Sequence, residues 1–192
     1  MKTLTQVIEI QVSEELSLRE ITLDDAVAVF NLIDANRDYL GKWLPFIKYS
    51  KHVADTETFI RSVTEKSNIS ELVFTITYKE RLVGIIGFKD IDYANLKLEI
   101  GYWLEESQQH KGIMVRSCAA LLRYAFKIIK INRVQIKVGV GNNRSNNIPK
   151  KLGFAFEGIE REGELITQDQ FHDLEIYSLL KKEWVKQQSL LR

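Results

Sequence analysis

Apolar and polar residues alternate along residues 96–104, near the middle of the chain. Successive side chains of a strand point to opposite faces, so a period of two predicts a half-buried strand. After a short polar loop, apolar residues recur every three or four positions over residues 114–129, which predicts an amphipathic helix. Strict alternation resumes over residues 134–140 and predicts a second strand. A strand–helix–strand unit closes with a right-handed crossover, so we expect the two strands to be parallel.

Patterns before this unit predict further strands and two helices. The first helix begins with Thr22 and has Asp25 three residues later, an arrangement typical of a capping box. Short turns between the strands predict an antiparallel meander that includes the 96–104 strand. The expected strands lie at residues 4–21, with a polar break at 13–15, and at 73–78 and 81–88; the expected helices lie at residues 22–33 and 55–66.

Patterns after the unit predict one helix and two late strands. The helix opens at about residues 146–148 and closes at Gly153, which places Pro149 in its first turns, where proline is tolerated. The strands are expected at residues 156–166 and 171–180, and the remainder is mostly polar. Residues 1–192 therefore predict one α/β (α+β) domain with a central mixed, mostly antiparallel sheet flanked by helices.

Charge and composition narrow the class of function. The formal net charge is +1, so the chain lacks the strong positive field of a nucleic-acid-binding protein. The single cysteine, Cys118, excludes an internal disulfide and falls on the apolar stripe of the central helix. The three histidines are scattered, so we expect no metal site. No apolar run spans a bilayer and no signal peptide is evident, which predicts a cytoplasmic protein without a membrane partner.

The loop before the central helix is suited to a phosphate. Gly112 stands at the predicted helix start, where the first N–H groups lack partners and the helix dipole adds partial positive charge. Glycine lets an anion approach the backbone closely, and Lys111 adds charge. One glycine between a strand and a helix is also compatible with an ordinary connection.

The spacing Gln109-x-x-Gly112-x-Met114 resembles the acyl-CoA-binding loop of the GNAT superfamily of N-acetyltransferases, Gln/Arg-x-x-Gly-x-Gly/Ala. Gly-Ile-Met resembles one branch, the ribosomal-protein N-terminal (serine/alanine) acetyltransferases, which usually has glycine where His110 stands. Met114 replaces the small residue of the general pattern. The resemblance implies a GNAT-like fold with a splayed parallel strand pair and acetyl-CoA (CoA) bound between those strands. It assigns these cofactor-binding residues: Ile100, Tyr102, Trp103, Leu104, Gln109, His110, Lys111, Gly112, Ile113, Met114 and Asn142.

A second motif, Asn142-x-x-Ser145 ahead of Lys-Leu-Gly-Phe, strengthens the resemblance. Many family members carry a tyrosine proton donor where Pro149 stands here. In the N-terminal acetyltransferase branch, the serine of the motif is proposed to take the place of this proton donor and to hydrogen-bond the leaving sulfur. This serine corresponds to Ser145. The resemblance also implies that Asn142 contacts the pantetheine. The alternatives are that Ser145 caps the next helix and that Asn142 is a turn residue.

The resemblance places a catalytic base on the late strand, at Glu164. Glu157, Glu160 and Glu162 are competing carboxylates, and deprotonation through water is a further alternative. A carboxylate in a partly apolar cleft can have its pKa raised toward the working range.

Residues 37–46 form an aromatic segment that resembles the Arg-x-x-Leu-x-x-Trp-Leu segment near the acceptor site of the same branch. Tyr39 and Trp43 are therefore expected in the substrate pocket. The alternative is that these aromatic residues close one end of the core.

The resemblance implies an enzyme that transfers an acetyl group by direct attack of a primary amine, since no residue is evident for a covalent intermediate. The acceptor it suggests is the N-terminal amine of a protein, with a ribosomal protein as the example in this branch. Relatives in the branch that pair through late strands suggest a homodimer. Alternatives are a small-molecule amine acetyltransferase for a polyamine or antibiotic, and a non-catalytic acyl-CoA-binding module. A nucleotide-binding regulator is disfavoured because the chain lacks a Gly-x-Gly-x-x-Gly or Walker loop.

Overall fold

The computed structural model describes residues 7–65, 69–167 and 169–190. Its strands are β1 (Glu9–Ser13), β2 (Leu16–Glu20), β3 (Leu72–Tyr78), β4 (Arg81–Asp92), β5 (Lys97–Leu104), β6 (Arg133–Gly139), β7 (Ala155–Thr167) and β8 (Gln170–Leu180). Its α-helices are α1 (Ala26–Ala35), α2 (Arg37–Leu40), α3 (Val53–Thr64), α4 (Ile113–Tyr124), α5 (Asn143–Lys151) and α6 (Lys181–Leu190). Short 3₁₀ turns lie at η1 (Leu23–Asp25), η2 (Pro45–Lys48) and η3 (Glu106–Gln108), and a π turn, η4 (Ala125–Ile129), extends α4.

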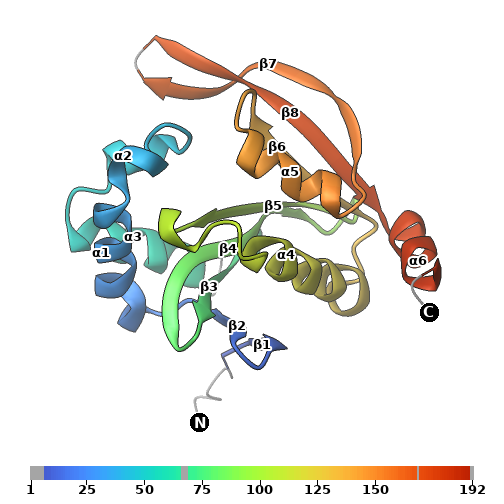
Figure 1. The fold of residues 1–192 in the computed structure, drawn as a ribbon, viewed down its shortest axis with the longest axis horizontal. Helices are drawn as coiled ribbons and strands as arrows, with labels where there is room; N and C mark the ends of the chain where they lie inside the picture. Colours follow the sequence, from blue (N-terminus) through green and yellow to red (C-terminus); the bar gives the residue numbers. More distant parts are fainter. Residues whose placement is uncertain (1–6, 66–68, 168, 191–192) are drawn as a thin grey trace.

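The strands form one sheet in the order β1-β2-β3-β4-β5-β6-β8-β7. Among the strands of the described residues only β5 and β6 pair in parallel, which confirms the predicted mixed, mostly antiparallel sheet. Their pairing runs from Lys97 opposite Arg133 to Glu99 opposite Gln135 and then stops. Beyond Glu99 the two strands diverge, and Figure 1 shows β5 leaving β6 and the β7–β8 hairpin above it.

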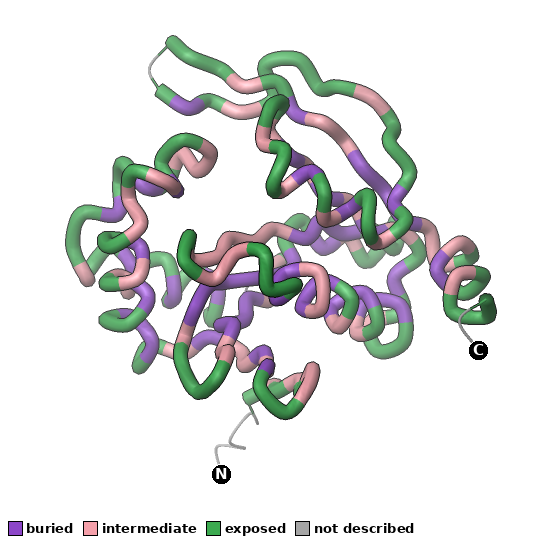
Figure 2. The backbone as a smooth tube through the Cα atoms, viewed as in Figure 1, coloured by how far each residue is buried: buried purple, intermediate pink, exposed green. Residues whose placement is uncertain are grey.

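Helices cover both faces of the sheet, each over its own apolar cluster. On one face α4 contributes Cys118, Leu121 and Leu122, which pack with the apolar sides of the central strands. On the other face α1 and α3 contribute residues such as Ile33 and Ile60. Figure 2 shows burial concentrated in the central strands and on α4, whereas β7 is exposed along most of its length. Among the described residues, no helix combines the length and apolar character that crossing a membrane requires.

Several predicted boundaries are wrong, for local reasons. The first turn after Thr22 is 3₁₀ rather than α, although Asp25 accepts the Thr22 N–H at 2.8 Å as the capping box predicts. The second predicted helix corresponds to α3, which begins at Val53 and not at Asp55. Asp55 instead accepts the N–H groups of Lys51 and His52, each at 2.8 Å, from the third position of the helix.

Differences in the second half of the chain bear more directly on the site. Leu96 is an exposed turn residue with φ of 51° rather than the first residue of β5. Asn142 is the N-cap of α5, so that helix begins at Asn143 and Pro149 lies in its interior. The polar C-terminal segment forms α6, which buries Trp184. The ends of the predicted elements at residues 4–6 and 66 lie outside the described residues.

Candidate active site

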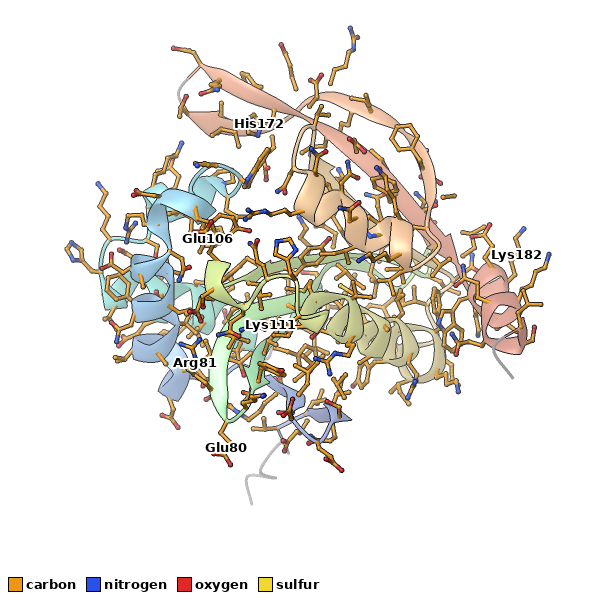
Figure 3. The ribbon with its side chains drawn as sticks, in the orientation of Figure 1. Glu80, Arg81, Glu106, Lys111, His172 and Lys182 are labelled. Atoms are coloured by element: carbon orange, nitrogen blue, oxygen red, sulfur yellow. The ribbon has the colours of Figure 1, made fainter. Side chains whose placement is uncertain are left out.

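A cleft of about 390 Å³ opens where β5 and β6 diverge. Its walls come from strands β4, β5, β6, β7 and β8, from α2 and α5, and from the start of α4. Figure 3 shows His172 on the β7–β8 hairpin above this opening and Lys111 on the loop before α4 below it. The residues predicted for the site that line the cleft are Tyr39, Trp43, Ile100, Tyr102, Trp103, Leu104, Gln109, His110, Gly112, Ile113, Met114, Asn142, Ser145 and Glu164. Lys111 is the exception: it is exposed and does not line the cleft, and its Nζ donates to Gln108 Oε1 at 2.7 Å.

The start of α4 fits a phosphate group. Gly112 is the N-cap and has φ of 70°, in the left-handed region that glycine adopts without strain. A Cβ at this position would meet no atom within 4 Å, so there is open space beside the helix start. The N–H of Arg116 bonds the Gly112 carbonyl at 3.1 Å, and the N–H groups before it in the first turn have no partner within the helix. Open space beside such N–H groups is where an anion is stabilised.

The residues on either side of Gly112 explain the departures from the family pattern. His110 has φ of 61°, which is why related sequences can carry glycine there. Met114 is only 6% exposed and belongs to the main apolar cluster, so its larger side chain fills core space below the loop.

The first turn of α5 holds Ser145 and Asn142 on the opposite wall of the cleft. Asn142 Oδ1 accepts the Ser145 N–H at 3.2 Å, which makes Asn142 the helix cap. The cap is therefore Asn142 and not Ser145, and the Ser145 hydroxyl is left to point to the cleft wall, where it lies 3.2 Å from the Tyr102 hydroxyl.

Glu164 is half-buried on β7 and lines the cleft. Burial raises its pKa above the usual range of a glutamate, while electrostatic interactions with Lys89 and His172 oppose that rise. The three competing carboxylates are placed differently. Glu157 is held by Arg133 at 2.6 Å, which lowers its pKa to about 2, Glu160 pairs with Lys137 at 2.7 Å, and Glu162 is exposed.

The charged residues of the cleft that were not predicted include Glu99 and Lys89. Glu99 on β5 is 5% exposed, and one of its carboxylate oxygens lies 2.8 Å from Lys89 Nζ on β4. Both line the cleft together with Glu164. Glu99 raises the pKa of Lys89 despite the opposing effect of burial, so Lys89 stays charged beside the two carboxylates. In the sequence, Glu99 occupies a polar position of an alternating strand, a pattern that indicates exposure to solvent.

The aromatic segment serves both of the roles considered for it. Leu40 is 3% exposed and packs in the cluster beneath α1 and α3, whereas Tyr39 and Trp43 line the cleft. The Tyr39 hydroxyl accepts a hydrogen bond from Gln109 Nε2, which joins α2 to the loop before α4. The Trp43 ring lies against His172, with ring centroids 5.8 Å apart.

Arg37 holds this aromatic segment in place, and its replacement gives a first prediction. Its guanidinium donates to the carbonyls of Ile47 and Ser50, each at 2.8 Å. We expect Arg37→Lys to lower the free energy of unfolding by about 1–2 kcal/mol, because a single ammonium cannot reproduce the planar fork. Urea unfolding measures the change, with Arg61→Lys on the exposed side of α3 as control. Equal stability of the two variants would contradict this role.

Comparison with known proteins agrees with the site. Residues 15–155 match the family described as Acetyltransferase (GNAT) domain. A Bacillus subtilis protein named "Putative ribosomal N-acetyltransferase YdaF" is 37% identical over 177 residues, covering 91% of this chain and 96% of the relative. The structure of the acetyltransferase MccE, of microcin C7 self immunity, in complex with acetyl-CoA and AMP superposes with a TM-score of 0.84, at 30% identity over 89% of this chain and 95% of that one.

A further solved structure is RimL, a ribosomal L7/L12 alpha-N-protein acetyltransferase, in complex with coenzyme A. It superposes with a TM-score of 0.86, at 26% identity over 92% of this chain and 99% of the RimL chain. The family suggested by Gln109-x-x-Gly112 and Asn142-x-x-Ser145 is thereby confirmed. This chain belongs to the GNAT acetyltransferase family and is an acetyl-CoA-dependent N-acetyltransferase.

Proposed function

We propose that the single domain of residues 1–192 acetylates the N-terminal amine of a protein, with a ribosomal protein as the first candidate. The observation that carries the proposal is Glu164, a half-buried carboxylate with a raised pKa in the same cleft as Gly112 and Ser145. The names of the relatives YdaF and RimL support a ribosomal, alpha-N acceptor. A ribosomal acceptor also implies that the reaction takes place in the cytoplasm.

Glu164 is the proposed general base. An amine must lose a proton before its nitrogen can attack a thioester, and a base works best when its pKa is close to the working pH. Burial moves the pKa of Glu164 in that direction. Lys89 and His172 oppose this rise, and it is the ionised carboxylate that takes the proton.

The divergence of β5 from β6 supplies the proposed site for the thioester. β5 loses its ladder partner β6 beyond Glu99, so backbone N–H groups on that edge of residues 100–104 face the cleft. One of them can donate to the carbonyl oxygen as it gains negative charge. The first N–H groups of α4 hold the pyrophosphate, and Gln109 and Asn142 border the pantetheine path. The Ser145 hydroxyl stabilises the departing sulfur.

Direct attack is favoured because the cysteine is poorly placed to act as a nucleophile. Cys118 is fully buried in α4, and burial raises the pKa of its thiol far above neutrality. A buried thiol in its neutral form is unreactive. The amine is therefore proposed to attack acetyl-CoA itself, with Tyr39 and Trp43 forming the acceptor side of the cleft.

An acceptor panel tests the proposal. Release of the CoA thiol is measured with acetyl-CoA and peptides that begin with serine or alanine, the same peptides with a blocked α-amine, and small amines including spermidine. We expect turnover on the free peptides and about a hundredfold lower kcat/KM on the blocked peptides and small amines. Turnover confined to small amines would refute the protein acceptor, and tight CoA binding with no turnover on any acceptor would favour a binding module.

A further inference from the structure

Pro149 leaves one carbonyl of α5 without its usual partner. In an α-helix the N–H of each residue bonds the carbonyl four residues earlier, and proline has no N–H. Pro149 lies inside α5, so the carbonyl of Ser145 receives no hydrogen bond from position 149. The phenol of Tyr102, on β5 across the cleft, donates to this carbonyl instead, with an oxygen–oxygen distance of 3.2 Å.

The same phenol also meets the side chain of Ser145. The Ser145 hydroxyl donates to the Tyr102 oxygen, again at 3.2 Å. A phenol has one proton, so it can donate to only one of these two oxygens at a time. Because both distances are equal, rotation of the O–H bond changes the acceptor without moving α5 or β5. Burial raises the pKa of Tyr102, which keeps the phenol protonated at all working pH values.

In this arrangement the Ser145 hydroxyl cannot yet donate a hydrogen bond to the leaving sulfur. Its single hydroxyl proton is directed to Tyr102, and none is left for a sulfur atom. If the Tyr102 O–H turns toward Ser145 Oγ, the serine oxygen becomes an acceptor and its own proton is freed for another partner. The backbone of Ser145 stays fixed meanwhile through the Asn142 cap.

We propose that Tyr102 is a positioning residue that switches its O–H from the carbonyl to the hydroxyl of Ser145 as the thiolate departs. The carbon–sulfur bond breaks, the electron pair remains on sulfur, and the amine proton is taken by Glu164. Tyr102 and Ser145 keep their own protons and contribute hydrogen bonds only. The strand β5 thus supplies the tyrosine hydroxyl that the helix position of Pro149 cannot. This inference rests on the proposed place of the sulfur beside Ser145, but not on the identity of the acceptor.

The pKa of the bound CoA thiol tests the switch without any acceptor. It is measured from the ultraviolet absorbance of the thiolate in the complex with CoA, as a function of pH. In Tyr102→Phe the Ser145 hydroxyl can still donate to sulfur, but it loses the phenol O–H that would polarise it. We therefore expect the thiol pKa to rise by about one unit, which is a tenfold loss of preference for the thiolate. Affinity for CoA in the thiol form should stay within about twofold, and kcat should fall about tenfold. Tyr124→Phe is the control, since this ring packs on Phe74 and Phe88 in the core.

A double substitution identifies the path of the effect. We expect Ser145→Ala to raise the thiol pKa at least as much as Tyr102→Phe does, and the double variant to raise it no further than Ser145→Ala alone, because the phenol acts on sulfur only through Ser145 Oγ. Additive shifts would show that Tyr102 acts on sulfur directly. An unchanged thiol pKa in Tyr102→Phe would show that the phenol is only structural. Either result overturns the proposal, whereas failure on all peptide acceptors would affect only the proposed substrate.

Pro149→Ala provides a second variant that does not remove the phenol. An alanine N–H can bond the Ser145 carbonyl as in an ordinary helix, which leaves the Tyr102 O–H free for Ser145 Oγ. We expect the thiol pKa to stay the same or to fall. A rise would contradict the switch even if Tyr102→Phe proved unstable.

Discussion

Glu164→Gln is expected to lower kcat/KM by about a hundredfold to ten-thousandfold while acetyl-CoA still binds. Glutamine has nearly the same shape as glutamate but cannot accept the proton of the attacking amine. Steady-state kinetics on the best acceptor give the ratio, and calorimetry gives acetyl-CoA affinity. Glu162→Gln is the matched control, because Glu162 lies on the same strand and is exposed. Loss of activity in the control alone, or in neither variant, would contradict the assignment of the base.

The pH profile distinguishes the loss of a catalytic base from a change in the shape of the active site. Glu164 accepts a proton only as a carboxylate, so kcat/KM of the wild-type enzyme should fall as the pH decreases through its pKa. Burial raises that pKa, so this acidic limb is expected above the usual range of a glutamate. The residual activity of Glu164→Gln should lack this limb. A limb that persists unchanged in the variant would point to another base, and Glu99 would then be the next residue to replace.

Gly112→Asp is expected to weaken acetyl-CoA binding by about tenfold to a hundredfold relative to Gly112→Asn. A side chain at this position enters the open space beside the helix start, and a carboxylate there repels a pyrophosphate. Asparagine has the same size without the charge and tolerates the φ of 70°. Comparing the two variants therefore separates charge from bulk and from backbone strain.

Isothermal titration of acetyl-CoA at low ionic strength measures the difference, and added salt should reduce it. Wild-type affinity in both variants would mean that the phosphates bind away from α4. An equal loss in both would assign the effect to space or to the loop conformation instead of charge.

The parts of the fold that follow from local pattern were predictable. Strict alternation at residues 134–140 located β6, and the helical stripe through Cys118 and Leu122 located the buried face of α4. Gly112 was recognised because a glycine between strand and helix has a local meaning. The boundaries of α3 and α5 were wrong because Asp55 lies at the third position of α3 and not at its start, and because Asn142, considered as a turn residue, caps α5 in place of Ser145.

The electrostatic partners in the cleft were not predictable, since they depend on where two strands part. Glu99 is buried at the last pair of the β5–β6 ladder, where the two strands begin to diverge, whereas an alternating pattern assigns its side to solvent. Lys89, ten positions earlier, reaches it through strand pairing that the sequence leaves open. The contact between Tyr102 and Ser145 likewise joins a strand and a helix that only the tertiary fold brings together.

A crystal structure of the protein with CoA tests the central claim most directly, namely that one donor molecule spans Gly112, the diverging edge of β5 and Ser145. We predict pyrophosphate oxygens within hydrogen-bond distance of the first N–H groups of α4, and the sulfur beside Ser145 Oγ on the side of the cleft that holds Glu164. A pyrophosphate bound away from Gly112, or a sulfur that points away from Ser145 and Glu164, would contradict the account.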